Sequence, residues 1–153
     1  MALWGIDPAS KKIAMFTDDD GAIKANKLSV PRTDRNTELL ILRHFMQQVL
    51  EWDKNPVIFC EEPVVAGARN LRSTILIAET VGVVLALDAR VHLVPVSSWK
   101  KGTIGRGNAT KDEVSAWLGQ HHPKYAGQCR GDQDLTDAAA IYLYGRAALD
   151  VSS

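Results

Sequence analysis

The N-terminal part of the chain consists of short hydrophobic segments separated by polar residues. The segments over 2–6, 12–17 and 22–29 have the length and composition of β-strands. Between the second and the third lies Asp18-Asp19-Asp20-Gly21, a sequence typical of a tight hairpin turn. The pattern therefore predicts three strands in an antiparallel meander.

Hydrophobic residues farther along the chain recur at helical spacing. They predict a helix that is capped by Asn36 or Thr37 and extends to Trp52. A short, continuous apolar strand over 57–60 follows, and a loop then leads into a second long helix over about 69–87.

The second helix is apolar on more than one face. Few polar positions separate its hydrophobic residues, which are Ile75, Leu76, Ile77, Ala78, Val81, Val83, Val84, Leu85 and Leu87. One face can pack on the sheet, and a second subunit is the simplest cover for the other, although the chain itself is an alternative cover. We therefore expect a homodimer through the helix that contains Ile75 and Leu87.

The C-terminal half begins with a fifth strand over 91–94 and a short amphipathic turn around Trp99. Thr110 and Glu113 have the spacing of a capping box, which predicts a helix over 111–120. The sequence His121-His122-Pro123 then ends this helix.

The order of the elements restricts the fold. A polar stretch over 124–131 leads to a last helix from about residue 132 or 133 to 149. The whole order predicts an α/β fold whose mixed five-stranded sheet has three antiparallel strands, then two parallel ones, and helices on both faces. A chain of 153 residues has room for one such domain, over 1–153.

Composition narrows the class of protein. The 18 basic and 18 acidic residues cancel, so that any attraction to nucleic acid must come from local clusters of Lys and Arg. Only Cys60 and Cys129 are present, too few for a secreted disulfide scaffold, and Cys60 lies in an apolar run typical of a buried thiol. With no basic leader and no apolar stretch long enough to cross a membrane, we expect a cytoplasmic protein.

Four acidic residues occupy positions where ligands usually bind. Asp7 ends the first strand, Glu61 ends the fourth, and Asp134 and Asp137 lie one turn apart on the last helix. Ligands of open α/β sheets bind at the strand ends. If the helix meets those ends, the four carboxylates converge.

Such a cluster needs protons or cations, because unpaired carboxylates about 4 Å apart repel by several kcal/mol. Mg²⁺ prefers oxygen ligands and accepts phosphate oxygens in its remaining positions, and two such ions can cleave a phosphodiester. The alternative is structural: Asp at a strand end often forms a turn, and Asp134 can favour the dipole of its helix.

These motifs resemble a known family. Gly5-Ile6-Asp7-Pro8, a strand ending in Glu61, and Asp134-Leu135-Thr136-Asp137-Ala138 are similar to the RuvC family of Holliday-junction resolvases, which has the RNase H-like fold. The segment from Trp99 to Lys111 resembles the Lys-containing loop of that family, and the resemblance covers about residues 3–144.

The resemblance implies roles for individual residues. It implies that two Mg²⁺ or Mn²⁺ ions are held by Asp7, Glu61, Asp134 and Asp137. It places Lys100 and Lys111 at the DNA backbone or at the scissile phosphate, and Lys111 among the catalytic residues.

Local charge agrees with a DNA-binding surface. Two basic patches could flank the acids, one formed by Lys100, Lys101, Arg106 and Lys111 and the other by Arg69 and Arg72. The alternative is a solvated basic loop.

The chain also departs from the family pattern. Glu62 is adjacent to Glu61, and since successive strand residues point to opposite faces, we expect only Glu61 in the site. The family's aromatic residue in the following loop has no counterpart, because the loop over 63–67 has only aliphatic side chains.

We therefore expect a dimeric, Mg²⁺-dependent endonuclease that resolves four-way or other branched DNA by paired phosphodiester hydrolysis. Two alternatives remain: an RNase H-like nuclease acting on RNA or unbranched nucleic acid, and a non-catalytic junction-binding dimer. No membrane partner is expected.

Overall fold

A computed structural model describes residues 2–64 and 71–152. Within them, one five-stranded sheet has the order β3-β2-β1-β4-β5. Its strands are β1 (Leu3–Pro8), β2 (Lys12–Asp19), β3 (Ala22–Ser29), β4 (Val57–Glu61) and β5 (Arg90–Val94). The first three pair antiparallel, whereas β4 runs parallel to both β1 and β5. The predicted mixed sheet is confirmed.

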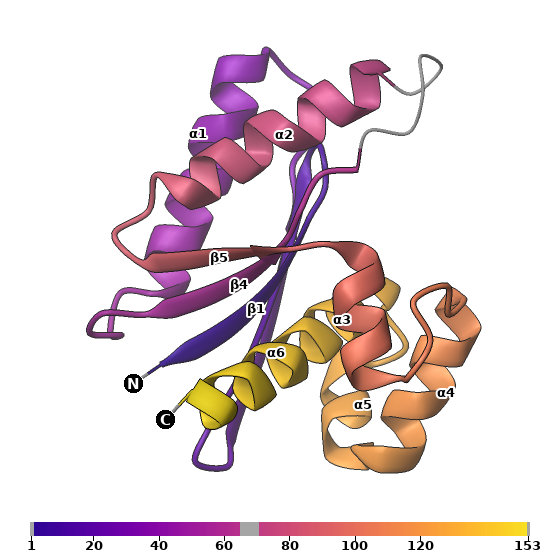
Figure 1. Ribbon diagram of the computed structural model, residues 1–153. Coiled ribbons are helices and arrows are strands. Elements are labelled where there is room, and N and C mark those ends of the chain that lie inside the picture. Colours follow the sequence, from indigo (N-terminus) through magenta and orange to yellow (C-terminus); the bar gives the residue numbers. More distant parts are fainter. Residues whose placement is uncertain (1, 65–70, 153) are drawn as a thin grey trace.

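Helices cover both faces of the sheet, as predicted (Figure 1). On one face lie α1 (Arg35–Val49) and α2 (Leu71–Leu85). On the other lie α3 (Val96–Thr103), α4 (Lys111–His121), α5 (Pro123–Cys129) and α6 (Gln133–Ser152). None of the helices in the described ranges is long and apolar enough to cross a membrane.

The hairpin between β2 and β3 turns on two residues. Asp19 pairs with Ala22, which leaves Asp20 and Gly21 as the turn, at φ of 50° and 92°. Both angles lie in the left-handed region that type I′ hairpin turns require. Oδ1 of Asp18 accepts a hydrogen bond from the Gly21 amide at 2.8 Å, which fixes the turn.

Helix starts agree with the sequence in one case and differ in another. The capping box of Thr110 and Glu113 is confirmed at the start of α4. The cap of α1 is Asp34, so the prediction of Asn36 or Thr37 is wrong. The Asp34 carboxylate accepts a hydrogen bond from the Thr37 amide at 3.0 Å, and the helix therefore begins earlier than its hydrophobic pattern.

Two predicted irregular segments are helical. The turn around Trp99 is the helix α3, and most of the polar stretch over 124–131 is the helix α5. Pro123 stands in the first turn of α5, where its missing N–H costs no hydrogen bond. Helix α5 buries only Tyr125 and Cys129, so its apolar pattern is too sparse to be recognised.

Helix α6 lies unusually close to β1 at Gly5. A Cβ atom added to Gly5 would overlap the carbonyl oxygen of Ala138 and the amide nitrogen of Tyr142, both backbone atoms. Backbone cannot move aside as a side chain can. The absence of a side chain at Gly5 therefore sets the distance between the strand that carries Asp7 and the helix that carries Asp137.

We predict that Gly5→Ala lowers the free energy of unfolding by about 3 kcal/mol, because overpacking must push α6 away from β1. Urea denaturation monitored by circular dichroism measures the change. Gly119→Ala in α4 is the matched control: an added Cβ there has no neighbouring atom within 4 Å. Its expected effect is small or stabilising. Equal stability of the two variants would contradict the close packing.

Candidate metal centre at the ends of β1 and β4

Strands β1 and β4 bring two acids to one level of the sheet. Their register pairs Ile6 with Cys60, so that Asp7 and Glu61 follow side by side on neighbouring strands. Gly5 faces α6, and side chains two residues apart share a face, so Asp7 also points to the α6 side.

Glu61 lies on the same side. Phe59, two residues before it, belongs to a core cluster with Ile141 of α6. Oε1 of Glu61 accepts a hydrogen bond of 3.0 Å from the indole nitrogen of Trp99, a fully buried side chain of α3. The adjacent Glu62 comes directly after the strand, and by the alternation of strand side chains it is expected to point to the opposite face of the sheet.

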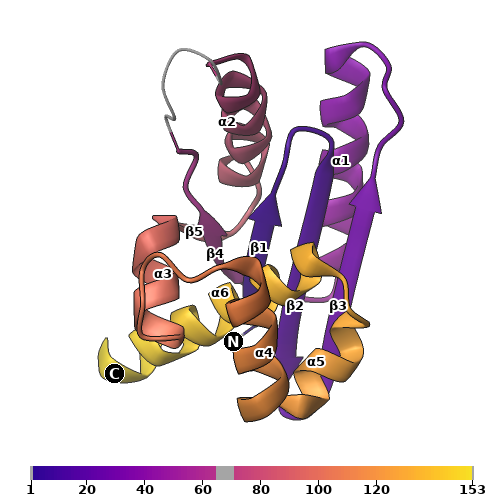
Figure 2. The ribbon, with the colours of Figure 1, turned by 90° about the vertical axis from the view of Figure 1, so that its right-hand side faces the viewer.

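The first turns of α6 supply the other two acids. Asp132 precedes the helix, and its Oδ1 accepts a hydrogen bond from the Leu135 amide at 3.0 Å. Asp134 and Asp137 follow, one turn apart on the helix. Figure 2 shows α5 and the first turns of α6 against β2 and β3, on the side of the sheet toward which Asp7 points.

Electrostatics joins these acids into one cluster. Burial raises the pKa of Asp7 well above its usual value. The negative charges of the other three acids raise it further, in the order Glu61, Asp137 and Asp134. The structure thus brings together the four acids that the sequence singled out, with Asp7 in the electric field of the rest.

Each of the other three acids has a polar partner. Besides the bond from Trp99 to Glu61, Oδ1 of Asp137 accepts a hydrogen bond of 2.9 Å from Gln133 Nε2. The pKa of Asp137 is nevertheless raised, chiefly by burial. No hydrogen bond or ion pair between described residues reaches the side chain of Asp7. Asp7 is therefore the least compensated charge of the cluster.

Two lysines hold Asp134. Its Oδ2 lies 2.7 Å from Lys27 Nζ and 3.1 Å from Lys12 Nζ. Burial would raise the pKa of Asp134, but the hydrogen bonds from Lys27 and Lys12 outweigh it and lower that pKa. Neither lysine was among the predicted site residues. The only signal of each in the sequence is a polar residue among the apolar side chains on the α6 face of its strand.

The donor chemistry of the cluster fits a hard divalent cation, since carboxylate oxygens are the ligands that Mg²⁺ and Mn²⁺ prefer. In the described part of the chain, however, no group of three or more His, Cys, Asp or Glu side chains is arranged so that it could hold a metal ion. Glu61, Asp134 and Asp137 are instead each directed toward a protein donor.

The predicted basic residues divide into two groups. The positive charge of Lys100 acts on Glu61 and Asp137, and that of Lys111 acts on Asp137, so both lysines lie at the acidic cluster. Arg106 forms an ion pair with Glu113 instead.

The other predicted basic residues lie away from these contacts or outside the description. Lys101 and Arg72 are exposed, on α3 and in the first turn of α2. Arg69 lies outside the described residues.

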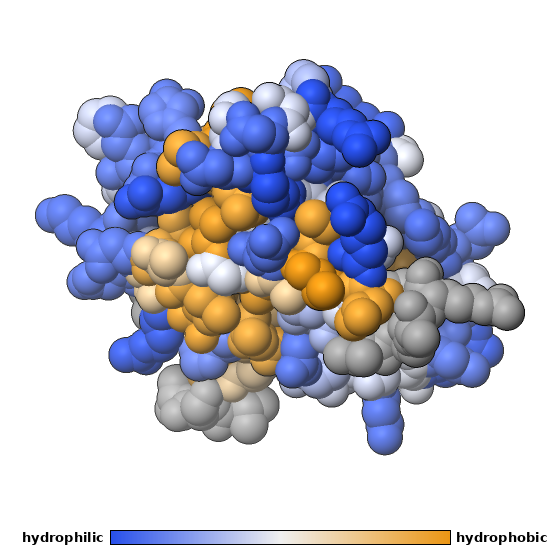
Figure 3. All heavy atoms as spheres, turned by 90° about the horizontal axis from the view of Figure 1, so that it is seen from above, coloured by the Kyte–Doolittle hydropathy of each residue, from blue (hydrophilic) through white to orange (hydrophobic). Residues whose placement is uncertain are grey.

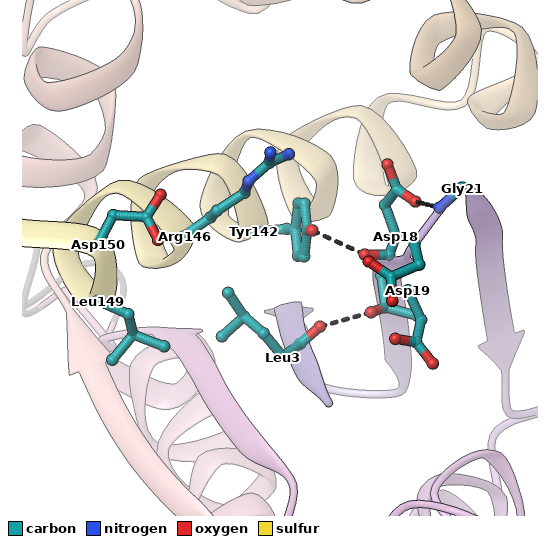
Figure 4. Close-up of a pocket in the computed structure, with 10 residues that line it drawn as sticks. Leu3, Asp18, Asp19, Gly21, Tyr142, Arg146, Leu149 and Asp150 are labelled. Carbon is teal, nitrogen blue, oxygen red and sulfur yellow. Dashed lines mark hydrogen bonds between the residues drawn. The ribbon is translucent and has the colours of Figure 1, made fainter. Parts of the chain in front are cut away.

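A separate pocket lies at the opposite end of the sheet. It has a volume of about 430 Å³ and lies between the β2–β3 hairpin and the C-terminal half of α6 (Figure 4). Asp18 lines it, but its carboxylate is already bound within the protein: besides the Gly21 contact in the hairpin, its Oδ2 accepts a hydrogen bond from Tyr125 of α5. None of the predicted site residues lines this pocket.

We predict that Asp7→Asn raises the melting temperature of the metal-free protein. A carboxyl group whose pKa is higher in the folded than in the unfolded state destabilises the fold at any pH above its unfolded pKa, and the amide removes this effect. The shift should be about 2–4 °C for each kcal/mol of repulsion relieved. Calorimetry measures it.

Asp20→Asn is the matched control, because Asp20 lies in the hairpin turn at φ 50°, which Asn also adopts readily. Its melting temperature should stay close to that of the wild type. A lower melting temperature for Asp7→Asn would contradict the unfavourable charge at Asp7.

Comparison with known proteins gives matches among solved structures. No protein-family model matches the sequence, and no curated protein matches it. RuvC of Thermus thermophilus is 18% identical with a TM-score of 0.70, over 99% of this chain and 97% of that chain. The same protein in complex with a Holliday-junction substrate is 16% identical with a TM-score of 0.75, over 99% and 96%.

A viral protein gives a third match. Fowlpox virus resolvase, in complex with Holliday-junction DNA, is 13% identical with a TM-score of 0.52, over 95% of this chain and 99% of that chain. At these identities the similarity concerns the fold alone: this chain has the RNase H-like fold of RuvC-like resolvases.

Proposed function

We propose that the chain is a divalent-metal-dependent endonuclease that resolves Holliday junctions and other branched DNA. The observation that carries this proposal is the placement of Asp7 and Glu61 side by side at the ends of β1 and β4, facing the helix that bears Asp134 and Asp137, in a RuvC-like fold. A protein that only bound DNA would gain nothing from uncompensated negative charge facing phosphate.

In the proposed reaction, two Mg²⁺ or Mn²⁺ ions would be held by Asp7, Glu61, Asp134 and Asp137. When bound, such ions activate a water molecule and stabilise the leaving oxygen of a phosphodiester. The protein positions the ligands: the Trp99 indole orients Glu61, and the Gln133 amide orients Asp137. The products would be a 5′-phosphate and a 3′-hydroxyl.

The basic residues would hold the DNA backbone. Lys100 and Lys111 lie where their charge reaches the acids, so we assign them to the phosphates next to the cleaved bond. Lys101, Arg106, Arg69 and Arg72 are assigned to more distant phosphates. For Arg106 the DNA would compete with Glu113.

A homodimer would supply the two active sites that paired incision requires. The α2 helix leaves Leu71, Ile75 and Leu85 exposed at 54%, 51% and 50%. With the exposed Leu40 and Ile41 of α1, they form an apolar surface over these two helices (Figure 3). A second copy covering this surface would leave both acidic clusters free, because those lie on the other side of the sheet.

We predict that Asp7→Asn lowers the rate of nicking of a synthetic four-way junction at least about 100-fold, because it removes a carboxylate that is proposed to hold the metal ions. A 100-fold loss corresponds to about 2.8 kcal/mol of transition-state stabilisation, at about 1.4 kcal/mol for each tenfold. Junction binding, measured by gel shift in Ca²⁺ or EDTA, should persist. Asp20→Asn, the hairpin control, should cut as the wild type does. Undiminished nicking by Asp7→Asn would overturn the proposal.

Substrate competition separates the nuclease hypotheses. Unlabelled junction should suppress nicking of labelled junction, whereas unbranched duplex or RNA at equal salt should not. Efficient cutting of RNA would favour the RNase H-like alternative. The absence of nicking in both Mg²⁺ and Mn²⁺ would favour the non-catalytic alternative.

We predict that Ile75→Glu raises the dimer dissociation constant at least about tenfold, because it buries an unpaired charge in the interface. Sedimentation velocity at micromolar concentration measures the effect. Trp52→Glu is the control, because it adds the same charge at an exposed hydrophobic residue that is not part of α2: Trp52 is 85% exposed and lies beyond the end of α1. A wild-type chain that stays monomeric would contradict the dimer.

A further inference from the structure

The acidic cluster contains two cations of its own. Lys12 comes from β2 and Lys27 from β3, and both ammonium groups contact the same oxygen, Oδ2 of Asp134. Lys27 also contacts Oδ2 of Asp132 at 2.8 Å. Asp134 thus has two direct cationic partners, whereas none of the ion pairs between described residues includes Asp7.

These ion pairs are partly shielded from water. The side chains of Lys27 and Asp134 are 24% and 27% exposed, and that of Lys12 is 44% exposed. Partly buried ion pairs are screened less by salt than surface pairs are. Their positions follow from the pleat, since Ala14 on β2 and Ala25 on β3, two residues from Lys12 and Lys27, pack in the core beneath α6.

Lys12 also acts on the centre of the cluster. Its positive charge lowers the pKa of Asp7, against the effect of the three neighbouring acids. The effect of Lys12 on Asp7 therefore has the same sign as the effect that a bound metal ion would have. A divalent cation entering the cluster meets two ammonium groups that repel it and hold one of its four prospective ligands.

We propose that Lys12 and Lys27 compete with the divalent cation for Asp134, and that a DNA phosphate entering the site draws the lysines away. This inference rests on the proposed function, because it assigns Asp134 to the metal. Metal binding to the free protein would then be weak, and metal and DNA would strengthen each other's binding by the same factor, as thermodynamic linkage requires.

A purely structural role makes the opposite prediction. Lys27 ties Asp132, which precedes α6, to β3, and so helps to place the start of that helix. If the lysines only kept the ligands in position, removing either would weaken metal binding. If they compete with the metal, removing either strengthens it. Whether the metal affinity rises or falls when a lysine is removed therefore distinguishes competition from a structural role.

The test is a Mn²⁺ titration of the full chain without DNA, followed by electron paramagnetic resonance and calorimetry. We expect Lys12→Met and Lys27→Met to bind Mn²⁺ about fivefold more tightly than the wild type, the effect of one partly screened ion pair. Lys12→Arg keeps the charge and should stay close to the wild type. Lys24→Met is the control for net charge, because Lys24 is exposed on β3 and an odd number of residues from Lys27, facing away from α6.

Two results would overturn the inference: unchanged or weaker Mn²⁺ binding by both lysine variants, or an equal gain in Lys24→Met. Lys12→Met keeps the test valid if Lys27→Met unfolds, because Lys12 is the more exposed and has no contact with Asp132. Wild-type binding below detection, together with clear binding by Lys12→Met, supports competition. No binding by any of these proteins overturns it.

A second titration tests the role of DNA. In the presence of a four-way junction with phosphorothioate linkages, which resists cutting, the difference between the wild type and Lys12→Met should narrow to less than about twofold. An unchanged difference would overturn the part of the inference that assigns the release of Asp134 to DNA.

Nicking assays keep the two proposals apart. If the wild type nicks junctions in Mg²⁺ while the lysine variants bind Mn²⁺ no more tightly, competition fails and the nuclease assignment stands. If the wild type never nicks in Mg²⁺ or Mn²⁺, the nuclease assignment fails, and the Mn²⁺ titration still decides whether the lysines oppose metal binding.

Discussion

Helix α6 packs so closely on β1 that the backbone of the helix occupies the space where a side chain of Gly5 would be. The acidic cluster depends on this contact. Asp7 lies two residues after Gly5 on the strand. On the helix, Asp137 is next to Ala138, and Asp134 lies one turn earlier. Parallel pairing of β1 with β4 then adds Glu61 at the same level. Acids from three distant segments of the sequence thus share one electric field.

That field has an energetic cost for the folded chain. The pKa values of Asp7, Glu61 and Asp137 are raised, chiefly by burial, so each is harder to ionise in the folded state than in the unfolded one. Asp134 differs, because two lysines lower its pKa. A site in which three acids are left undercompensated and one is held by ammonium groups is a compromise between stability and affinity for a cation.

Most of the fold could be predicted from the sequence, because strands with turn residues between them and helices with regular apolar spacing carry local signals. The helix α5 could not, since only Tyr125 and Cys129 of it are buried. The acids were recognisable from their places at strand ends and on one helix face. The contacts of Lys12 and Lys27 with Asp134 span more than 100 positions, and Arg106 pairs with Glu113, so the partners of these charges required the folded structure.

Where α6 crosses β1 at Gly5, the helix carries a run of small residues. Ala138, Ala139 and Ala140 are completely buried, and alanine, like glycine, has no rotamers to lose on folding or to exchange afterwards. At Gly5 the helix and the strand therefore meet backbone to backbone, where no side chain can turn to make room. Adjustment of the acidic cluster to an incoming ion must therefore come from side-chain torsion angles, those of the carboxylates and of the two lysines that hold Asp134.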